Sequence, residues 1–164
     1  MRYLDQYRKL HAARKFPGMS MIPFASDVAE LVGEFQSKTI LDYGCGMGLQ
    51  YSRDKIFKMW ANQPPKLYDP AVPGHDVKPV GKFDGVISTD VMEHIPEDEL
   101  VEVVAEIAGY ARQWALISVC CRPSKHIRFD DGENVHITIH PFAWWQEYLA
   151  PHFSSARLVL KETE

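Results

Sequence analysis

Three glycines at alternate positions, Gly44, Gly46 and Gly48, follow a short apolar run that ends in Asp42. Glycine lets the backbone adopt positive φ and lets a ligand approach the main chain closely, because there is no Cβ. The acid would repel a pyrophosphate but would attract a ligand that carries an ammonium group. A dinucleotide-binding turn would also need its third glycine where Leu49 stands. The stretch therefore predicts a strand, a tight turn and a helix start that bind a cationic ligand.

A second acid, Asp69, ends the short run that begins at Lys66 and lies about 20 residues beyond Gly48. A carboxylate at this spacing, at the end of a second strand, is where an open α/β sheet holds the two hydroxyls of a ribose. We therefore expect Asp69 to bind a ribose. A ligand with an amino-acid end, a cationic centre and a ribose is S-adenosylmethionine.

The stretch from Phe83 to Pro96, FDGVISTDVMEHIP, is the second one that carries polar groups at the end of an apolar run. A strand over about 85–88 is expected to run into Thr89, Asp90, Glu93 and His94. Ligands bind at the carboxyl ends of strands in open α/β sheets. These side chains are therefore expected to face the same site as the glycine turn.

Together the two stretches resemble a known family. LDYGCGMG, residues 41–48, resembles motif I of the class I S-adenosylmethionine-dependent methyltransferases, and FDGVISTDVMEHI, residues 83–95, resembles a second signature of the same enzymes. The resemblance implies a Rossmann-like α/β sheet with helices on both faces, and S-adenosylmethionine as cofactor with S-adenosylhomocysteine as product. The cofactor-binding residues that it implies are Asp42, Tyr43, Gly44, Cys45, Gly46, Gly48, Asp69, Pro70, Thr89, Asp90 and Val91.

Methyl transfer from a sulfonium is a direct displacement that depends mainly on alignment and on exclusion of water, so no protein nucleophile is required. A base near a hydroxyl acceptor would add about 10²–10⁴-fold. His136 and His94 are the candidate bases because histidine titrates near neutral pH, and Asp90 or Glu93 could orient either of them. The expected reaction is methylation of an O or N acceptor on a small molecule or a sugar-like substrate.

The long polar loop over residues 122–136 does not identify the molecule that accepts the methyl group. Arg122, Lys125 and Arg128 could contact an acidic substrate, or they could simply keep an exposed loop in water. A loop of this length in a compact domain is usually functional. His136, at its end, resembles the histidine that follows a strand in many small-molecule methyltransferases.

Two alternative functions remain from the sequence. One group of side chains resembles the metal site of small-RNA 3′-end ribose 2′-O-methyltransferases; it consists of Asp90, Glu93, His94, His136 and His140. Those enzymes have a glutamate where this chain has Asp90. We expect no metal, but the resemblance keeps a metal-assisted RNA methyltransferase as an alternative. The chain could also bind S-adenosylmethionine as a non-catalytic partner subunit. A nucleotide-binding oxidoreductase is disfavoured by the missing third glycine.

The chain has 164 residues, 46% of them hydrophobic, and a formal net charge of −4. This length fits a single domain, residues 1–164, with a helical cap over 1–37 and a Rossmann-like core over 38–160. The charge disfavours a broad nucleic-acid surface. No apolar run approaches ~18 residues and the first residues are polar, so no membrane segment or signal peptide is expected and the expected location is the cytoplasm. The expected partners are a small-molecule substrate and a second copy or another chain.

Helical spacing of apolar residues predicts a helix over 2–15 and a second one that Ser26 caps, with residues 16–24 as a lid between them. Five prolines and glycines within 70–82 predict a loop in place of the third strand and helix of the family, and His75 and Asp76 are candidates to contact an adenine there. A helix after Pro96 is expected to bury residues up to Ala111. A strand is expected over 114–121, a helix from Pro141, and an edge strand over 154–160 followed by four frayed residues.

Overall fold

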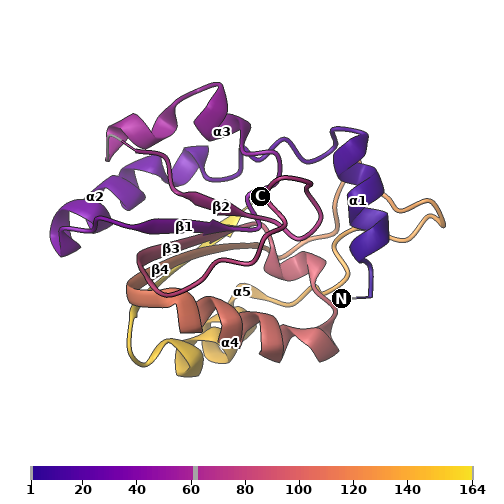
Figure 1. Cartoon of the computed structure of the whole chain (residues 1–164). Helices are drawn as coiled ribbons and strands as arrows, with labels where there is room; N and C mark the ends of the chain where they lie inside the picture. The colour runs from indigo at the N-terminus through magenta and orange to yellow at the C-terminus, as the bar shows by residue number, and fades with distance from the viewer. Residues whose placement is uncertain (1, 61–62, 164) are drawn as a thin grey trace.

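The computed structural model describes residues 2–60 and 63–163, and its centre is a five-stranded sheet in which every pairing is parallel (Figure 1). The strand order is β2-β1-β3-β4-β5. The strands are β1 (Ile40–Tyr43), β2 (Lys66–Tyr68), β3 (Phe83–Thr89), β4 (Ala111–Cys120) and β5 (Arg157–Thr163). The predicted α/β class with a parallel sheet is therefore confirmed.

Helices cover both faces of this sheet. In Figure 1, α2 and α3 lie on one side of it and α4 and α5 on the other. The α-helices are α1 (Leu4–Ala12), α2 (Ala25–Phe35), α3 (Leu49–Ser52), α4 (Leu100–Tyr110) and α5 (Phe142–Leu149). Short 3₁₀ helices are η1 (Ile22–Phe24), η2 (Ile56–Met59), η3 (Met92–His94), η4 (Glu97–Glu99) and η5 (Ala150–Phe153). None of the helices in the described ranges is both long enough and apolar enough to cross a membrane.

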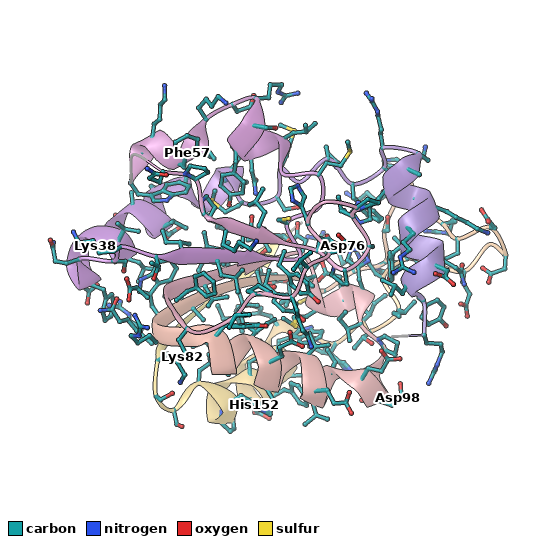
Figure 2. All side chains as sticks on the ribbon, in the orientation of Figure 1. Lys38, Phe57, Asp76, Lys82, Asp98 and His152 are labelled. Atoms are coloured by element: carbon teal, nitrogen blue, oxygen red, sulfur yellow. The ribbon has the colours of Figure 1, made fainter. Side chains whose placement is uncertain are left out.

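Alternation along the strands divides the core into two layers, because successive side chains of a strand point to opposite faces. Ile87 and Leu116 pack with the apolar stripe of α2, and Val86 and Ile117 pack with the buried side of α4. Strands buried on both faces in this way are apolar almost throughout. Figure 2 shows side chains filling both layers, with Phe57 on the side of α2 and α3 and His152 on the side of α4 and α5.

The strand order creates a crevice at one end of the sheet. β1 has β2 on one side and β3 on the other, so the connections after β1 and after β2 run in opposite directions across the sheet. In open α/β sheets, ligands bind outside the carboxyl ends of the strands at such a reversal. Helix α1 lies across this end of the molecule in Figure 1.

Residues 70–82 form the predicted loop, with neither a helix nor a strand between β2 and β3. Turns hold its first part, in which the Val72 amide donates to the Asp69 carbonyl and the Asp69 amide donates to the His75 carbonyl. The hydroxyl of Tyr110, the last residue of α4, donates to the Pro79 carbonyl at 3.0 Å and ties the loop to the second helical layer.

Several predicted boundaries were wrong. Ser26 does not cap α2, because the helix continues directly from η1 and its N-cap position is Phe24, with no side-chain cap bond. Ala111 is the first residue of β4 and not the end of a helix. The segment after Gly48 forms two short helices, α3 and η2, because Lys55 between them adopts φ 54°. Residues 61–62 lie outside the described part.

The predicted fraying at the end of the chain is also wrong for residues 161–163. They belong to β5, which pairs with β4 up to Thr163. The Thr163 hydroxyl donates to Asp90 Oδ1 at 2.8 Å, so the end of β5 is anchored to the crevice. Glu164, the last residue of that prediction, lies outside the described residues.

We expect Gly85→Ala to lower the free energy of unfolding by about 1–3 kcal/mol through overpacking. A Cβ at Gly85 would lie 2.0 Å from the indole of Trp114, which is fully buried. Gly109→Ala is the matched control, because it lies in α4 with nothing within 4 Å of its added Cβ and should stabilise by about 0.5–1 kcal/mol. Urea unfolding of both variants measures the difference, and equal stabilities would contradict the packing at Gly85.

Candidate functional site

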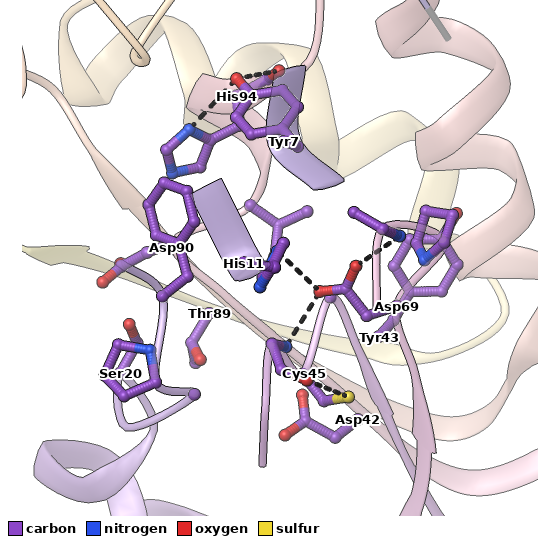
Figure 3. Close-up of a pocket in the computed structure, with 18 of the residues that line it drawn as sticks. Tyr7, His11, Ser20, Asp42, Tyr43, Cys45, Asp69, Thr89, Asp90 and His94 are labelled. Atoms are coloured by element: carbon purple, nitrogen blue, oxygen red, sulfur yellow. Dashed lines mark hydrogen bonds and ion pairs between the residues drawn. The ribbon is translucent and has the colours of Figure 1, made fainter. Parts of the chain in front are cut away.

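A cavity of about 370 Å³ lies at the carboxyl ends of β1 and β3, and Figure 3 shows the side chains around it. This volume lies within the range of small-molecule sites. The predicted cofactor residues line it, apart from Gly48; these are Asp42, Tyr43, Gly44, Cys45, Gly46, Asp69, Pro70, Thr89, Asp90 and Val91. The fold therefore brings together, around one cavity, residues from three separate stretches of the sequence.

The glycine turn has positive φ at all three glycines, 79° at Gly44, 56° at Gly46 and 60° at Gly48, as the sequence pattern requires. Its amides already have partners. Those of Gly44 and Cys45 both donate to the Tyr68 carbonyl, and that of Gly48 donates to the Cys45 carbonyl. These amides point into the protein, so they do not form a cradle for phosphate.

The N-terminus of α3 is covered as well. The Leu49 amide donates to the Pro17 carbonyl at 3.1 Å and the Gln50 amide donates to the Gly18 carbonyl at 3.2 Å. Free amides at a helix start are the groups that bind pyrophosphate in nucleotide folds. Here these amides are already bonded to the carbonyls of residues 17 and 18, and a phosphate would have to displace that segment of the chain.

Asp42 lies at the end of β1, and it is 1% exposed. Its Oδ2 accepts hydrogen bonds from the Tyr51 hydroxyl at 2.7 Å and from Gln50 Nε2 at 3.2 Å, whereas its buried Oδ1 has no partner. Burial raises the pKa of Asp42 to about 7, although the two hydrogen bonds oppose this rise. A cationic group in the cavity would supply the missing partner for Oδ1 and would favour the ionised form.

Asp69 follows β2 on the opposite side of the turn. Its Oδ2 accepts from the Gly46 amide and its Oδ1 accepts from the Ala71 amide, each at 2.9 Å. His11 Nε2, from α1, lies 3.8 Å from Oδ2 (Figure 3), and burial lowers the pKa of His11. An ionised carboxylate has about four lone-pair sites, so Asp69 can still accept two hydroxyl groups.

Asp90 stands where β3 leaves the sheet. It has φ 55°, a conformation that L-residues other than glycine seldom adopt. Its amide donates to the Ser118 carbonyl and its Oδ1 accepts from the Ser118 hydroxyl at 2.8 Å, so β4 holds this bend in place. The bend turns the chain over the cavity and places Val91 against the glycine turn, where an added Cβ at Gly44 would meet Val91 at 2.3 Å.

The four predicted catalytic residues occupy different positions. His94 and Asp90 line the cavity, whereas Glu93 and His136 do not. Glu93 is fully buried, and its Oε1 accepts from the Cys120 amide at 3.1 Å. His136 packs edge-on against His94 with ring centres 4.9 Å apart, and it lines a second cavity.

Burial controls the protonation of Glu93 and His94. It raises the pKa of Glu93 well above the usual range, and the charge of Asp90 adds to the effect. It lowers the pKa of His94 to about 3, with a further contribution from His136. His94 is therefore neutral at physiological pH.

The long loop after β4 forms a second cavity of about 260 Å³ behind His136. Its lining includes His126 and also Arg122 and Lys125, which give it positive charge. Arg128 instead donates to the carbonyls of Ser124 and Ile127 within the loop. His140 stacks on Trp144 and lies 3.2 Å from Glu97, so it is separate from the group of Glu93, His94 and His136.

The N-terminal segment supplies cavity residues from the predicted lid, residues 16–24, and others from α1 that the sequence did not single out. Tyr7 and His11 from α1 and Phe16 from the following segment line the cavity, as does Gln50 after the glycine turn. Tyr7 and His11 are four residues apart, on one side of a helix. That spacing was visible in the sequence, but it indicated only a buried helix face. The adenine candidates His75 and Asp76 do not line the cavity.

Comparison of the chain with protein-family models, with curated proteins and with solved structures found no match. The site is therefore interpreted from its own geometry.

Proposed function

We propose that this protein is a methyltransferase of the class I type that uses S-adenosylmethionine, with a Rossmann-like sheet in which the third strand and its helix are reduced to the loop at 70–82. The observation that carries the proposal is a pair of carboxylates on either side of the glycine turn, Asp42 and Asp69, which line the same cavity. Asp42 has an unpartnered oxygen for an ammonium group, and Asp69 has free lone pairs for the ribose hydroxyls.

The hydrogen bonding of the turn supports this ligand over a nucleotide phosphate. The amides that would bind a phosphate are taken by protein carbonyls, and the carboxylates would repel it. S-Adenosylmethionine has no phosphate, and its α-ammonium and sulfonium groups both carry positive charge. The aromatic rings of Tyr7 and Phe16, on the other side of the cavity, provide apolar surface and exclude water.

In the proposed reaction, a lone pair of the acceptor O or N attacks the methyl carbon while the bond from carbon to sulfur breaks. The sulfur would keep that electron pair as the neutral thioether of S-adenosylhomocysteine, and the proton of the acceptor would pass to the neutral imidazole of His94 or to water. The protein contributes alignment and a dry site. His94 reaches the cavity as a neutral imidazole, and its neighbour Asp90 is held by β4.

Isothermal titration calorimetry with S-adenosylmethionine tests the proposal. We expect one site per chain and a loss of affinity of about tenfold or more in Asp69→Asn, because the amide replaces an acceptor of charge-assisted hydrogen bonds. Asp76→Asn is the matched control, since Asp76 is exposed, belongs to the same loop and does not line the cavity. Absence of binding by the unmodified protein would refute the cofactor assignment, and equal loss in both variants would refute the role of Asp69.

A further inference from the structure

We infer that the second cavity binds the anionic group, a phosphate or a carboxylate, of a small-molecule methyl acceptor. The acceptor role rests on the proposed function, whereas the anion site itself does not. The cavity, about 260 Å³, is slightly smaller than drug-sized pockets of roughly 300–1,000 Å³, so it would hold one end of a ligand. Four of its eight lining residues are basic, Arg122, Lys125, His126 and His136, and none of the described residues in the lining is acidic.

The two permanent cations of this cavity are not neutralised by the protein. Arg122 and Lys125 are exposed, and within the described part of the chain neither side chain has an ion pair or a hydrogen bond. The fork of an arginine matches the oxygens of a phosphate or carboxylate, and a lysine binds them as a point charge. An anion in the cavity would therefore meet two cations that have no competing partner.

Two acids of the same loop are held elsewhere, against α1. Asp130 pairs with Lys9 at 3.0 Å, and Glu133 Oε2 accepts from the Tyr3 hydroxyl at 3.2 Å. Figure 1 shows this part of the loop beside α1. The loop therefore separates its charges, with basic side chains around the cavity and these two acids on the helix.

Hydrogen bonds within the loop hold the wall of the cavity in shape. Asn134 Oδ1 accepts from the amides of Ser124 and His136, at 3.0 and 2.9 Å, and Asn134 Nδ2 donates to the Ser124 carbonyl at 3.1 Å. His136 Nδ1 lies 2.6 Å from the Arg122 carbonyl, which can only accept, so this nitrogen carries a proton. These bonds join the two ends of the loop, and a site formed in advance needs less reorganisation on binding.

A buried acid beside the cavity does not oppose an anion. Glu93 Oε1 accepts from the amide of Cys120, which is the buried member of the cavity lining. Burial raises the pKa of Glu93 well above its usual range, so its carboxyl group is protonated at neutral pH. Glu93 therefore adds no negative charge next to the cavity.

The position of the cavity suits an acceptor site. His136 in its lining packs against His94, with ring centres 4.9 Å apart, and His94 lines the first cavity. In the proposed function the first cavity holds the methyl donor. A molecule anchored by its anionic group in the second cavity would extend past these two rings toward the donor.

A small molecule fits this site better than a nucleic acid does. A polyanion would continue along the loop and meet its acidic part, residues 130–133, which would repel further phosphates. The net charge of −4 also disfavours a broad nucleic-acid surface.

Titration of the isotopically labelled protein with inorganic phosphate and, separately, with acetate tests the anion site without S-adenosylmethionine. We expect saturable shifts of backbone amide NMR signals, confined to the cavity lining, with at least one of the two anions. Affinity should be at least about tenfold weaker in Arg122→Gln and in Lys125→Gln, because each loses a charge-assisted hydrogen bond. Because no cofactor is added, failure here leaves the cofactor proposal untouched.

Lys38→Gln is the matched control, because it removes the same charge from an exposed lysine at the other end of the molecule (Figure 2). It should bind the anion as the unmodified protein does. No saturable shift with either anion, shifts spread over the whole surface, or an equal loss in Lys38→Gln would each overturn the site. Tighter binding of a short single-stranded RNA to the same residues would overturn the choice of a small molecule.

Transfer of a labelled methyl group from S-adenosylmethionine tests the acceptor role. Small hydroxyl and amine compounds that carry a phosphate or carboxylate are compared with their neutral analogues. We expect turnover of charged compounds only, with KM about tenfold higher in Arg122→Gln than in Lys38→Gln. Equal turnover of the neutral analogues, or equal KM in the two variants, would overturn the acceptor role.

Discussion

Gly18→Ala is expected to reduce affinity for S-adenosylmethionine by at least about tenfold and to destabilise the protein. Gly18 has φ 70°, and an added Cβ would lie 2.2 Å from the Cys45 carbonyl oxygen and 2.5 Å from the Gly48 amide nitrogen. Both are backbone atoms of the glycine turn, so neither can rotate away. The methyl group would therefore push residues 16–20, which line the cavity, off the turn.

Gly18→Ala combines the strain of a positive φ with a clash against the glycine turn, and a second variant separates these two effects. Gly132 also has positive φ, 90°, but an added Cβ there meets nothing within 4 Å. In Gly132→Ala the free energy of unfolding should fall only by the cost of the left-handed conformation, about 1–2 kcal/mol, and the affinity for S-adenosylmethionine should be unchanged. Calorimetry with S-adenosylmethionine and urea unfolding on both variants provide the comparison. Unchanged affinity in Gly18→Ala would show that this segment does not shape the binding site.

Asp42→Asn is expected to stabilise the protein at pH 8 while weakening the binding of S-adenosylmethionine by about 10–100-fold. The pKa of Asp42 is raised from its ordinary value of 3.8 to about 7, so the folded state binds the proton more tightly than the unfolded state. Stability contributed by this proton is present below about pH 4 and is lost as the pH rises through 7. Asparagine removes that loss, but it also removes the charge that would hold the ammonium group.

The unmodified protein and Asp42→Asn should therefore differ in how their thermal stability and their affinity for S-adenosylmethionine depend on pH. The thermal unfolding midpoint of the unmodified protein should change less favourably from pH 4 to 8 than that of Asp42→Asn, because the contributions of Glu93, His94 and His11 are common to both. Affinity of the unmodified protein should rise from pH 5.5 to 7.5 as Asp42 ionises, whereas the ligand's α-amino group stays largely charged until its pKa of about 7.7–8.0. Parallel pH profiles would show that Asp42 does not contact the cation.

The sequence alone was sufficient for the class of fold and for the turn. Gly44, Gly46 and Gly48 require positive φ, and Asp42 and Asp69 mark the ends of two strands. The almost continuous apolar run before Cys121 is typical of a strand in a parallel sheet, and the sheet is parallel. These are local properties, since glycine geometry and a continuous run of apolar residues depend on a few neighbouring positions. Boundaries were less predictable, because Ala111 and residues 161–163 are placed by pairing with distant strands.

The tertiary structure alone decided what covers the turn and which titratable groups meet. Gly18 and Tyr7 reach the site because α1 folds back across the end of the sheet, and no local pattern specifies that return. His136 lies beside His94 because hydrogen bonds such as the one between His94 and the Val135 carbonyl, 41 positions apart, join the two segments. It lines the second cavity and not the one that the sequence assigned to it. Contacts between distant segments depend on packing of the whole chain, and spacing along the sequence does not encode them.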